Sequence, residues 1–240
     1  MIAEIHNKSG VITKGSEDEL TGNFFGSLRY LSFNKGLKPI LKSSIRPQKC
    51  AALLERIYEE KWDDRIEFWL QDTCEPDILI SFDDLDMIIE VKYKSGLSSE
   101  DQLEKYGDLL IRRSGDKAKV IFLLADDKDA YRIYNESVTN RKKSLLGEIP
   151  FGYMTWQNVY DALIELGNCD ILNTFDRVII SDLTKLLCKK GFEGFRNFEV
   201  GGLTVKSDET WEFDDSFIVI NDFSFEIEKN IERGLYYEFR

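Results

Sequence analysis

The stretch that decides the fold runs from Cys74 to Lys94 and reads CEPDILISFDDLDMIIEVKYK. Two apolar runs, Asp77–Phe82 and Met87–Lys94, flank the turn-like DDLD, which predicts an antiparallel hairpin. A third strand-like run, Arg65–Gln71, precedes them and is separated from the hairpin by the turn-like CEP. We therefore expect three consecutive antiparallel strands.

The last of these strands carries two charged residues in an apolar run. Because side chains alternate along a strand, one face holds Ile88, Glu90 and Lys92, and the other holds Met87, Ile89, Val91 and Tyr93. Opposite charges on a central strand are costly unless they are paired or bind a ligand. Asp77 follows Pro76 at the start of the preceding strand, and the hairpin would place it beside Glu90. Two carboxylates and a lysine suit a site for Mg²⁺ or Mn²⁺.

A plainer interpretation also fits these residues. Glu90 and Lys92 could form a salt bridge on a half-exposed sheet, and for the acid-x-lysine triplet alone we favour that interpretation. Similar triplets end at Lys61 and Lys128, both in polar settings without a preceding Pro-Asp pair. The combination with Asp77, a strand and a following helix favours the site.

Residues 16–33 have the pattern of a helix with Ser16 as its N-cap. At about 100° per residue, an apolar stripe forms from Leu20, Phe24, Leu28 and Leu31. Glu17 falls in the middle of that stripe, whereas Glu19 points away. Two interpretations stay open for Glu17: its negative charge interacts favourably with the helix dipole at the N-terminus, or its side chain is aimed at a buried polar site.

The other elements alternate between helix and strand. Helices are expected at 49–61, 99–113, 129–136, 157–166 and 170–190, and strands at 118–124 and 151–156, with one or two more strands in the tail. This order predicts an α/β fold in which helices flank a central mixed sheet.

Composition excludes several classes of protein. The 240 residues suit one large domain with at most a small appendage, and no apolar run is long enough to span a membrane or to form a signal peptide. The four cysteines form no CxxC pair, which favours a reducing, cytoplasmic setting. His6 is the one histidine, so histidine-based triads and zinc sites are nearly excluded.

Charge is unevenly distributed along a chain whose formal net charge is −12. The segment 34–50 contains no acid and holds five cations: Lys35, Lys38, Lys42, Arg46 and Lys49. It is either a solvated surface loop or a strip that contacts nucleic-acid phosphates. From Glu199 to Arg240 there are 11 acids and 4 bases, which marks an acidic C-terminal extension.

Three short motifs resemble those of the PD-(D/E)xK nuclease superfamily, which includes many restriction enzymes and RecB-type exonuclease domains. They are Pro76-Asp77, Glu90-Val91-Lys92, and the QLEKY segment from Gln102 to Tyr106, which is similar to the QxxxY motif. The resemblance covers about residues 10–198 and implies a restriction-endonuclease-like core. We therefore expect a nuclease-like domain over 1–198 and an extension over 199–240, packed on the same domain.

The resemblance also implies roles for particular residues. Asp77 and Glu90 would be metal ligands for Mg²⁺ or Mn²⁺, joined by the carbonyl of Val91 and by Glu17, directly or through water. Lys92 would position the attacking water. Gln102 would steady the site or a nucleotide with support from Tyr106, for which ordinary packing is the plain alternative.

The expected function is metal-dependent hydrolysis of phosphodiester bonds, in DNA rather than RNA because most relatives act on DNA. The bacterial character of the resemblance suggests restriction, phage defence or repair, and double-strand cutting would call for a homodimer. A non-catalytic nucleic-acid-binding or scaffold module is the alternative that the net charge of −12 favours. In a third interpretation, residues 199–240 dock a protein partner that the activity requires.

Overall fold

A computed structural model describes residues 17–58, 61–95, 97, 101–141 and 149–192. The chain divides into two units, Met1–Gly194 and Phe195–Arg240, and every described residue lies in the first. The predicted N-cap Ser16, the tail strands and the extension 199–240 lie outside the described residues.

The centre of the described unit is a five-stranded mixed sheet with strand order β1-β2-β3-β4-β5. The strands are β1 (Ile66–Phe68), β2 (Ile78–Ser81), β3 (Leu85–Val91), β4 (Ala118–Ala125) and β5 (Phe151–Thr155). β1 pairs with β2, and β2 with β3, in antiparallel orientation, which confirms the expected hairpin and its preceding strand. β3 pairs with β4, and β4 with β5, in parallel.

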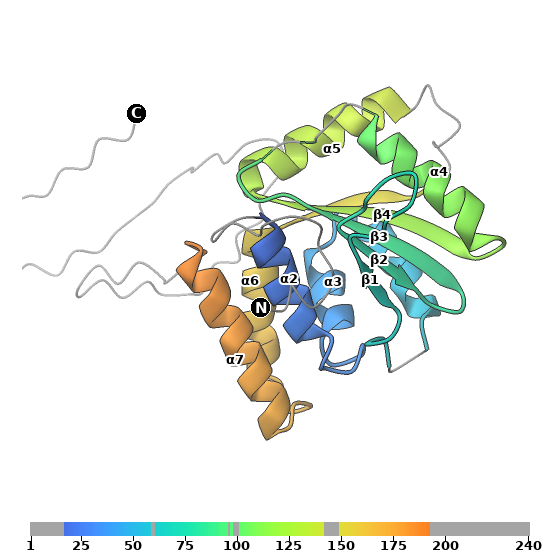
Figure 1. Cartoon of the computed structure of the whole chain (residues 1–240). Coiled ribbons are helices and arrows are strands. Elements are labelled where there is room, and N and C mark those ends of the chain that lie inside the picture. Colours follow the sequence, from blue (N-terminus) through green and yellow to red (C-terminus); the bar gives the residue numbers. More distant parts are fainter. Residues whose placement is uncertain (1–16, 59–60, 96, 98–100, 142–148, 193–240) are drawn as a thin grey trace, which may run out of the picture. The chain divides into compact units, whose positions relative to one another are not determined.

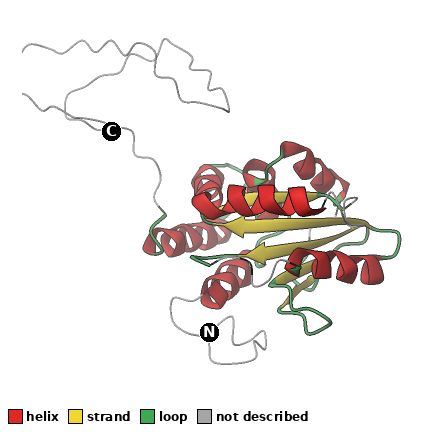
Figure 2. Cartoon of the chain, turned by 90° about the horizontal axis from the view of Figure 1, so that it is seen from above, coloured by secondary structure: helices red, strands yellow, loops and turns green. Residues whose placement is uncertain are grey.

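Helices cover both faces of the sheet, so the described unit is an α/β fold as predicted. On one side lie α4 (Gln102–Ser114) and α5 (Asp127–Arg141); the other side is covered by α2 (Glu17–Leu28), α3 (Leu37–Ser44), the 3₁₀ helix η1 (Gln48–Arg56), α6 (Trp156–Gly167) and α7 (Thr174–Lys189). Figure 1 shows these two layers above and below the strands. Figure 2, turned by 90°, shows helices lying over the strands.

An apolar core lies on each face of the sheet, and this explains why the sequence of β3 is an almost continuous hydrophobic run. Met87, Ile89 and Val91 belong to the core beneath the sheet, whereas Ile88 belongs to the core under α4. All seven residues of β3 are buried, as expected of a strand covered on both faces. The predicted alternation is confirmed, and burial of both faces makes every polar group on this strand costly.

The structure corrects the interpretation of 34–50 as a loop. Residues 37–44 form α3, because Leu37, Ile40 and Leu41 repeat at helical spacing and are buried. Of its two lysines, Lys42 is exposed, whereas Lys38 is partly buried. The helix predicted for 49–61 is the 3₁₀ helix η1 and ends at Arg56.

Other predicted helices also have different bounds. The helix expected at 129–136 is longer and runs from Asp127 to Arg141. The helix expected over 16–33 ends at Leu28, after which the chain turns and buries Leu31 and Phe33 in the same core. The helix expected from residue 170 begins at Thr174, because Asn173 and Asp176 form a reciprocal capping box there.

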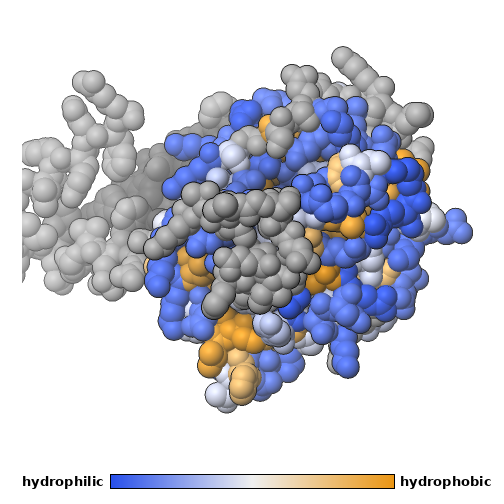
Figure 3. All heavy atoms as spheres, viewed as in Figure 1, coloured by the Kyte–Doolittle hydropathy of each residue, from blue (hydrophilic) through white to orange (hydrophobic). Residues whose placement is uncertain are grey.

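In the part of the chain that the structure describes, no helix is both long and apolar enough to cross a membrane. Figure 3 shows one face of the molecule, which is largely hydrophilic, with an apolar patch at the lower end and smaller ones elsewhere. Exposed apolar side chains that precede or begin α7 include Ile171, Phe175 and Val178.

Candidate active site

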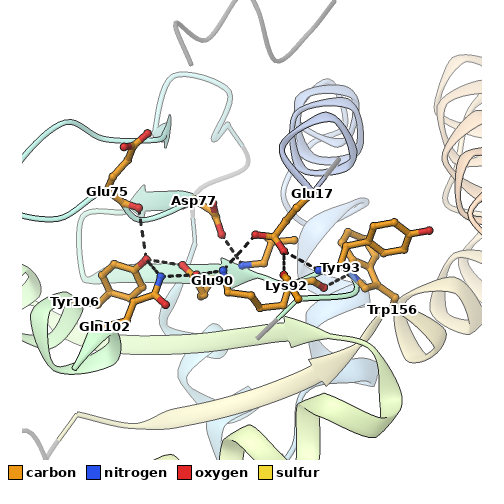
Figure 4. Close-up of polar contacts among 11 residues, drawn as sticks. Glu17, Glu75, Asp77, Glu90, Lys92, Tyr93, Gln102, Tyr106 and Trp156 are labelled. Carbon is orange, nitrogen blue, oxygen red and sulfur yellow. Dashed lines mark hydrogen bonds and ion pairs between the residues drawn. The ribbon is translucent and has the colours of Figure 1, made fainter. Parts of the chain in front are cut away.

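The predicted site residues meet at the carboxyl end of β3, where the ends of α2 and α4 approach the sheet (Figure 4). The hairpin register pairs Ile78 with Ile89, so Asp77 lies opposite Glu90. Glu17 begins α2 and Gln102 begins α4. Four separate segments of the chain therefore contribute to one cluster.

Lys92 is the centre of this cluster. Its Nζ lies 2.6 Å from Glu90 Oε1 and 3.2 Å from Glu17 Oε1, and the residue is 4% exposed. Its backbone N–H donates to Leu124 O at 2.7 Å, and its carbonyl accepts from Trp156 Nε1 at 3.0 Å. Both the ammonium group and the backbone of Lys92 are thus held in place.

Glu90 is held by two side chains from α4. Tyr106 OH donates to Glu90 Oε2 at 2.6 Å, and Gln102 Nε2 donates to Glu90 Oε1 at 2.7 Å. Gln102 Nε2 also lies 2.7 Å from Tyr106 OH, because residues four apart share one helix face. Packing alone, the plain alternative for Tyr106, therefore does not describe its contacts.

Asp77 is 7% exposed, and its Oδ2 accepts from the backbone N–H of Val91 at 2.9 Å. Burial, and then repulsion by Glu90, raise the pKa of Asp77 well above its ordinary value. Lys92 and the Val91 hydrogen bond oppose that rise. Ionisation of the Asp77 carboxyl is therefore unfavourable unless another cation lies nearby.

Glu17 reaches the cluster from the first turn of α2. Its Oε2 accepts from Tyr93 N at 2.8 Å and from Ser95 Oγ. Glu19 points elsewhere and pairs with Lys190 at 3.4 Å. Of the two interpretations left open for Glu17, the structure favours an acid aimed at a buried polar site.

The charges of the cluster are unequal, since three carboxyl groups surround one ammonium. Burial lowers the pKa of Lys92, but the carboxylates of Glu90, Asp77 and Glu17 outweigh it, and the net pKa is raised. Burial, followed by the charge of Glu90, raises the pKa of Tyr106. Lys92 therefore stays protonated and Tyr106 stays a neutral hydrogen-bond donor at neutral pH.

The donors suit a hard cation by their chemistry, because carboxylate and carbonyl oxygens are what Mg²⁺ and Mn²⁺ prefer. A divalent cation would also balance the excess of negative charge around Asp77. Across the described ranges, however, no three histidine, cysteine or acidic side chains are grouped as metal ligands. The oxygens of Asp77, Glu90 and Glu17 named above accept from protein donors, with which a cation would compete.

The five cations predicted to bind nucleic acid are not part of the cluster. Lys35 pairs with Asp176, Lys38 and Lys42 pair with Glu55, Arg46 donates to the carbonyls of Ser43 and Ile45, and Lys49 is exposed. Lys42 Nζ lies 2.6 Å from Glu55 Oε1. Much of the positive charge of this strip is thus balanced by the protein's own groups.

Sequence reasoning missed the contacts of Tyr93 and Ser95 with Glu17, and two further contacts at the cluster. Trp156 is fully buried and donates to the Lys92 carbonyl, although the segment Met154-Thr155-Trp156 carried no predicted role. Asp126 Oδ2 accepts from Lys94 N at 3.3 Å. Buried indole N–H groups usually have an acceptor, which is the one sequence-level signal for Trp156.

A surface hollow of about 520 Å³ lies at the opposite end of β3 and β4. It is lined by Arg56, Tyr58, Asp83, Asp84, Asp116, Lys117 and Ala118. None of these belongs to the Lys92 cluster, so the hollow is not where the buried charges gather.

The chain matches no protein-family model, and a search of curated proteins finds no match for it. The residues and their geometry are therefore what supports a function.

Proposed function

We propose that this protein is a metal-dependent nuclease of the PD-(D/E)xK type, with a restriction-endonuclease-like core, that hydrolyses phosphodiester bonds, with DNA as the favoured substrate. The observation that carries the proposal is the buried Lys92 ammonium, which lies between Glu90 and Glu17 beside Asp77. Such a cluster is costly to bury, and costly charge clusters gather at functional sites. Restriction, phage defence and repair are the settings that this chemistry serves.

Asp77, Glu90, the Val91 carbonyl and Glu17 would hold Mg²⁺ or Mn²⁺. Such an ion, when bound, lowers the pKa of a water molecule and neutralises charge on a phosphate oxygen. The raised pKa of Asp77 supports this assignment, because it reflects a buried carboxyl that lacks enough positive charge nearby.

Lys92 acts as a hydrogen-bond donor and a fixed positive charge. Since its pKa is raised, it keeps its proton and is not suited to be the general base. Its ammonium can orient the attacking water and stabilise the negative charge that develops on the scissile phosphate. Trp156 fixes the backbone from which it projects.

Gln102 and Tyr106 position Glu90. Their two hydrogen bonds engage both carboxylate oxygens, which fixes the direction in which Glu90 faces Lys92. The Tyr106 hydroxyl is 2.6 Å from Glu90 Oε2, the short distance typical of a bond to a charged acceptor. This network supports an assignment of Glu90 to a fixed catalytic geometry rather than to a surface salt bridge.

The test is cleavage of linear, circular and single-stranded DNA, and of RNA, with Mg²⁺ or Mn²⁺. Wild type is compared with Lys92→Ala and Asp77→Ala, and with Lys185→Ala as a control, because Lys185 is 68% exposed on α7. We expect metal-dependent cleavage that both site variants lose and the control keeps. Circular dichroism establishes that each variant is folded.

A Lys92→Ala protein that cuts as fast as wild type contradicts the proposal. Folded wild type that cuts nothing and binds no Mg²⁺ by calorimetry supports a non-catalytic module instead. If it binds Mg²⁺ and cuts nothing, a missing protein partner or an unusual substrate becomes the explanation to pursue.

A further inference from the structure

Two lysines flank one aromatic ring immediately after Lys92. Lys94 Nζ lies 5.0 Å, and Lys190 Nζ 5.7 Å, from the ring centroid of Tyr93. Tyr93 OH donates to the carbonyl of Lys190 at 3.2 Å, which joins the end of α7 to the end of β3. Both distances are within the range of a cation–π contact. The ring therefore holds two positive charges beside the acidic cluster.

Lys94 has a backbone conformation that lysine rarely adopts. Its φ is +60°, in the left-handed region that favours glycine and asparagine. Its N–H donates to Asp126 Oδ2, which holds this conformation. Residues kept in such conformations concentrate at functional sites. The chain thus keeps a lysine at a position where asparagine would be less strained.

The Lys94 side chain is also available to a ligand. It is exposed, and among the described residues its Nζ forms no ion pair with a carboxylate. Lys190, by contrast, shares its charge with Glu19. The strip at 34–50 differs as well, because Lys42 there is paired with Glu55.

We infer that Lys94 contacts a phosphate of the nucleic acid beside the scissile bond, and that Lys190, on the same ring, adds positive charge there. This inference rests on the proposed nuclease function. A polyanion approaching Glu17, Asp77 and Glu90 meets negative charge, in a chain of net charge −12. Lys94, two residues after Lys92, supplies an exposed cation that has no carboxylate ion pair among the described residues, although its charge also acts on the carboxyl of Asp126.

The test uses Lys94→Asn, because asparagine tolerates a positive φ while removing the charge. Binding to a fluorescein-labelled DNA duplex is measured by fluorescence anisotropy in a buffer that contains Ca²⁺. The salt concentration is varied from 50 to 300 mM, and wild type is measured alongside. We expect about tenfold weaker binding, the size of one lost charge-assisted hydrogen bond. The plot of log affinity against log salt concentration should become less steep, its negative slope decreasing in magnitude by about 0.9. The melting temperature should stay equal to that of wild type or rise.

Two further variants serve as comparisons. Lys185→Asn removes an exposed α7 charge and should bind like wild type. Lys42→Asn tests the strip at 34–50. Equal binding and equal salt slopes for Lys94→Asn and wild type overturn the inference, and so does a loss of affinity confined to Lys42→Asn. A lower melting temperature for Lys94→Asn also overturns it, since Lys94 is then structural.

Failure of the inference and failure of the proposed function give different results. Wild type that neither binds nor cleaves any nucleic acid removes the nuclease proposal and the contact together. Wild type that cleaves, with Lys94→Asn unchanged in both binding and KM, removes the contact alone.

Discussion

Replacing Lys92 by methionine tests whether the cluster is a buried charge network. Methionine keeps the length and the apolar stem of lysine, so the change removes the ammonium without opening a large cavity. The ammonium leaves behind Glu90, which is 1% exposed, together with Asp77 and Glu17. Glu90 and Glu17 each lose the ion pair described above.

The expected effect is large because one partner of a buried ion pair is removed. Such changes destabilise proteins by about 3–5 kcal/mol, since the remaining charge is left uncompensated. Each kcal/mol lowers the melting temperature of a domain of this size by about 2–4 °C. We therefore expect Lys92→Met to melt about 10 °C below wild type at pH 7 in EDTA.

The deficit should also depend on pH in a defined direction. Lys92 lowers the pKa of Asp77, so its loss raises that pKa further. Carboxyls whose folded pKa is raised are stabilising while protonated and destabilising once ionised. The difference between Lys92→Met and wild type should therefore shrink as the pH falls from 7 toward 4.

The assay is thermal unfolding followed by circular dichroism, with Lys185→Met as the exposed control. The double variant of Lys92→Met with Glu90→Gln should recover part of the loss, because it removes one of the unpaired charges. A melting temperature for Lys92→Met equal to wild type at pH 7, or a deficit that grows on acidification, refutes the reasoning.

Other variants test the groups around this lysine. Trp156→Phe leaves the buried Lys92 carbonyl without its indole donor and should cost about 1–3 kcal/mol in urea unfolding. Tyr106→Phe removes the hydroxyl donor to Glu90 and should cost about 1.5–3 kcal/mol, with folding retained. Asp77→Asn, in EDTA, should stabilise the protein at pH 7. The raised pKa of Asp77 stabilises wild type below about pH 4, the ordinary carboxyl range, and this stabilisation is lost as the pH rises through the folded pKa. The advantage of the Asn variant should thus grow from pH 4 to pH 8, and a constant difference in melting temperature would show that Asp77 does not titrate as described.

The sequence by itself determined the local features of the site. A period of two along residues 87–94 placed Glu90 and Lys92 on one face, and turn residues made the hairpin that brings Asp77 opposite Glu90. Helical spacing placed Gln102 and Tyr106 together. These relations involve residues close in the chain, where backbone geometry alone decides which side chains are neighbours.

Tertiary structure decided the contacts between distant segments. Glu17 and Lys92 are 75 residues apart, and Trp156 and Lys92 are 64 apart, so only the packing of α2 and α6 against the sheet brings them together. The same holds for Lys190 at Tyr93. Helix α3 is another example. Its lysines suggested a surface loop, but its apolar side chains are buried and the helix packs against α6. Periodicity shows which face of an element is buried, but which other element covers that face depends on how the whole chain fills its core.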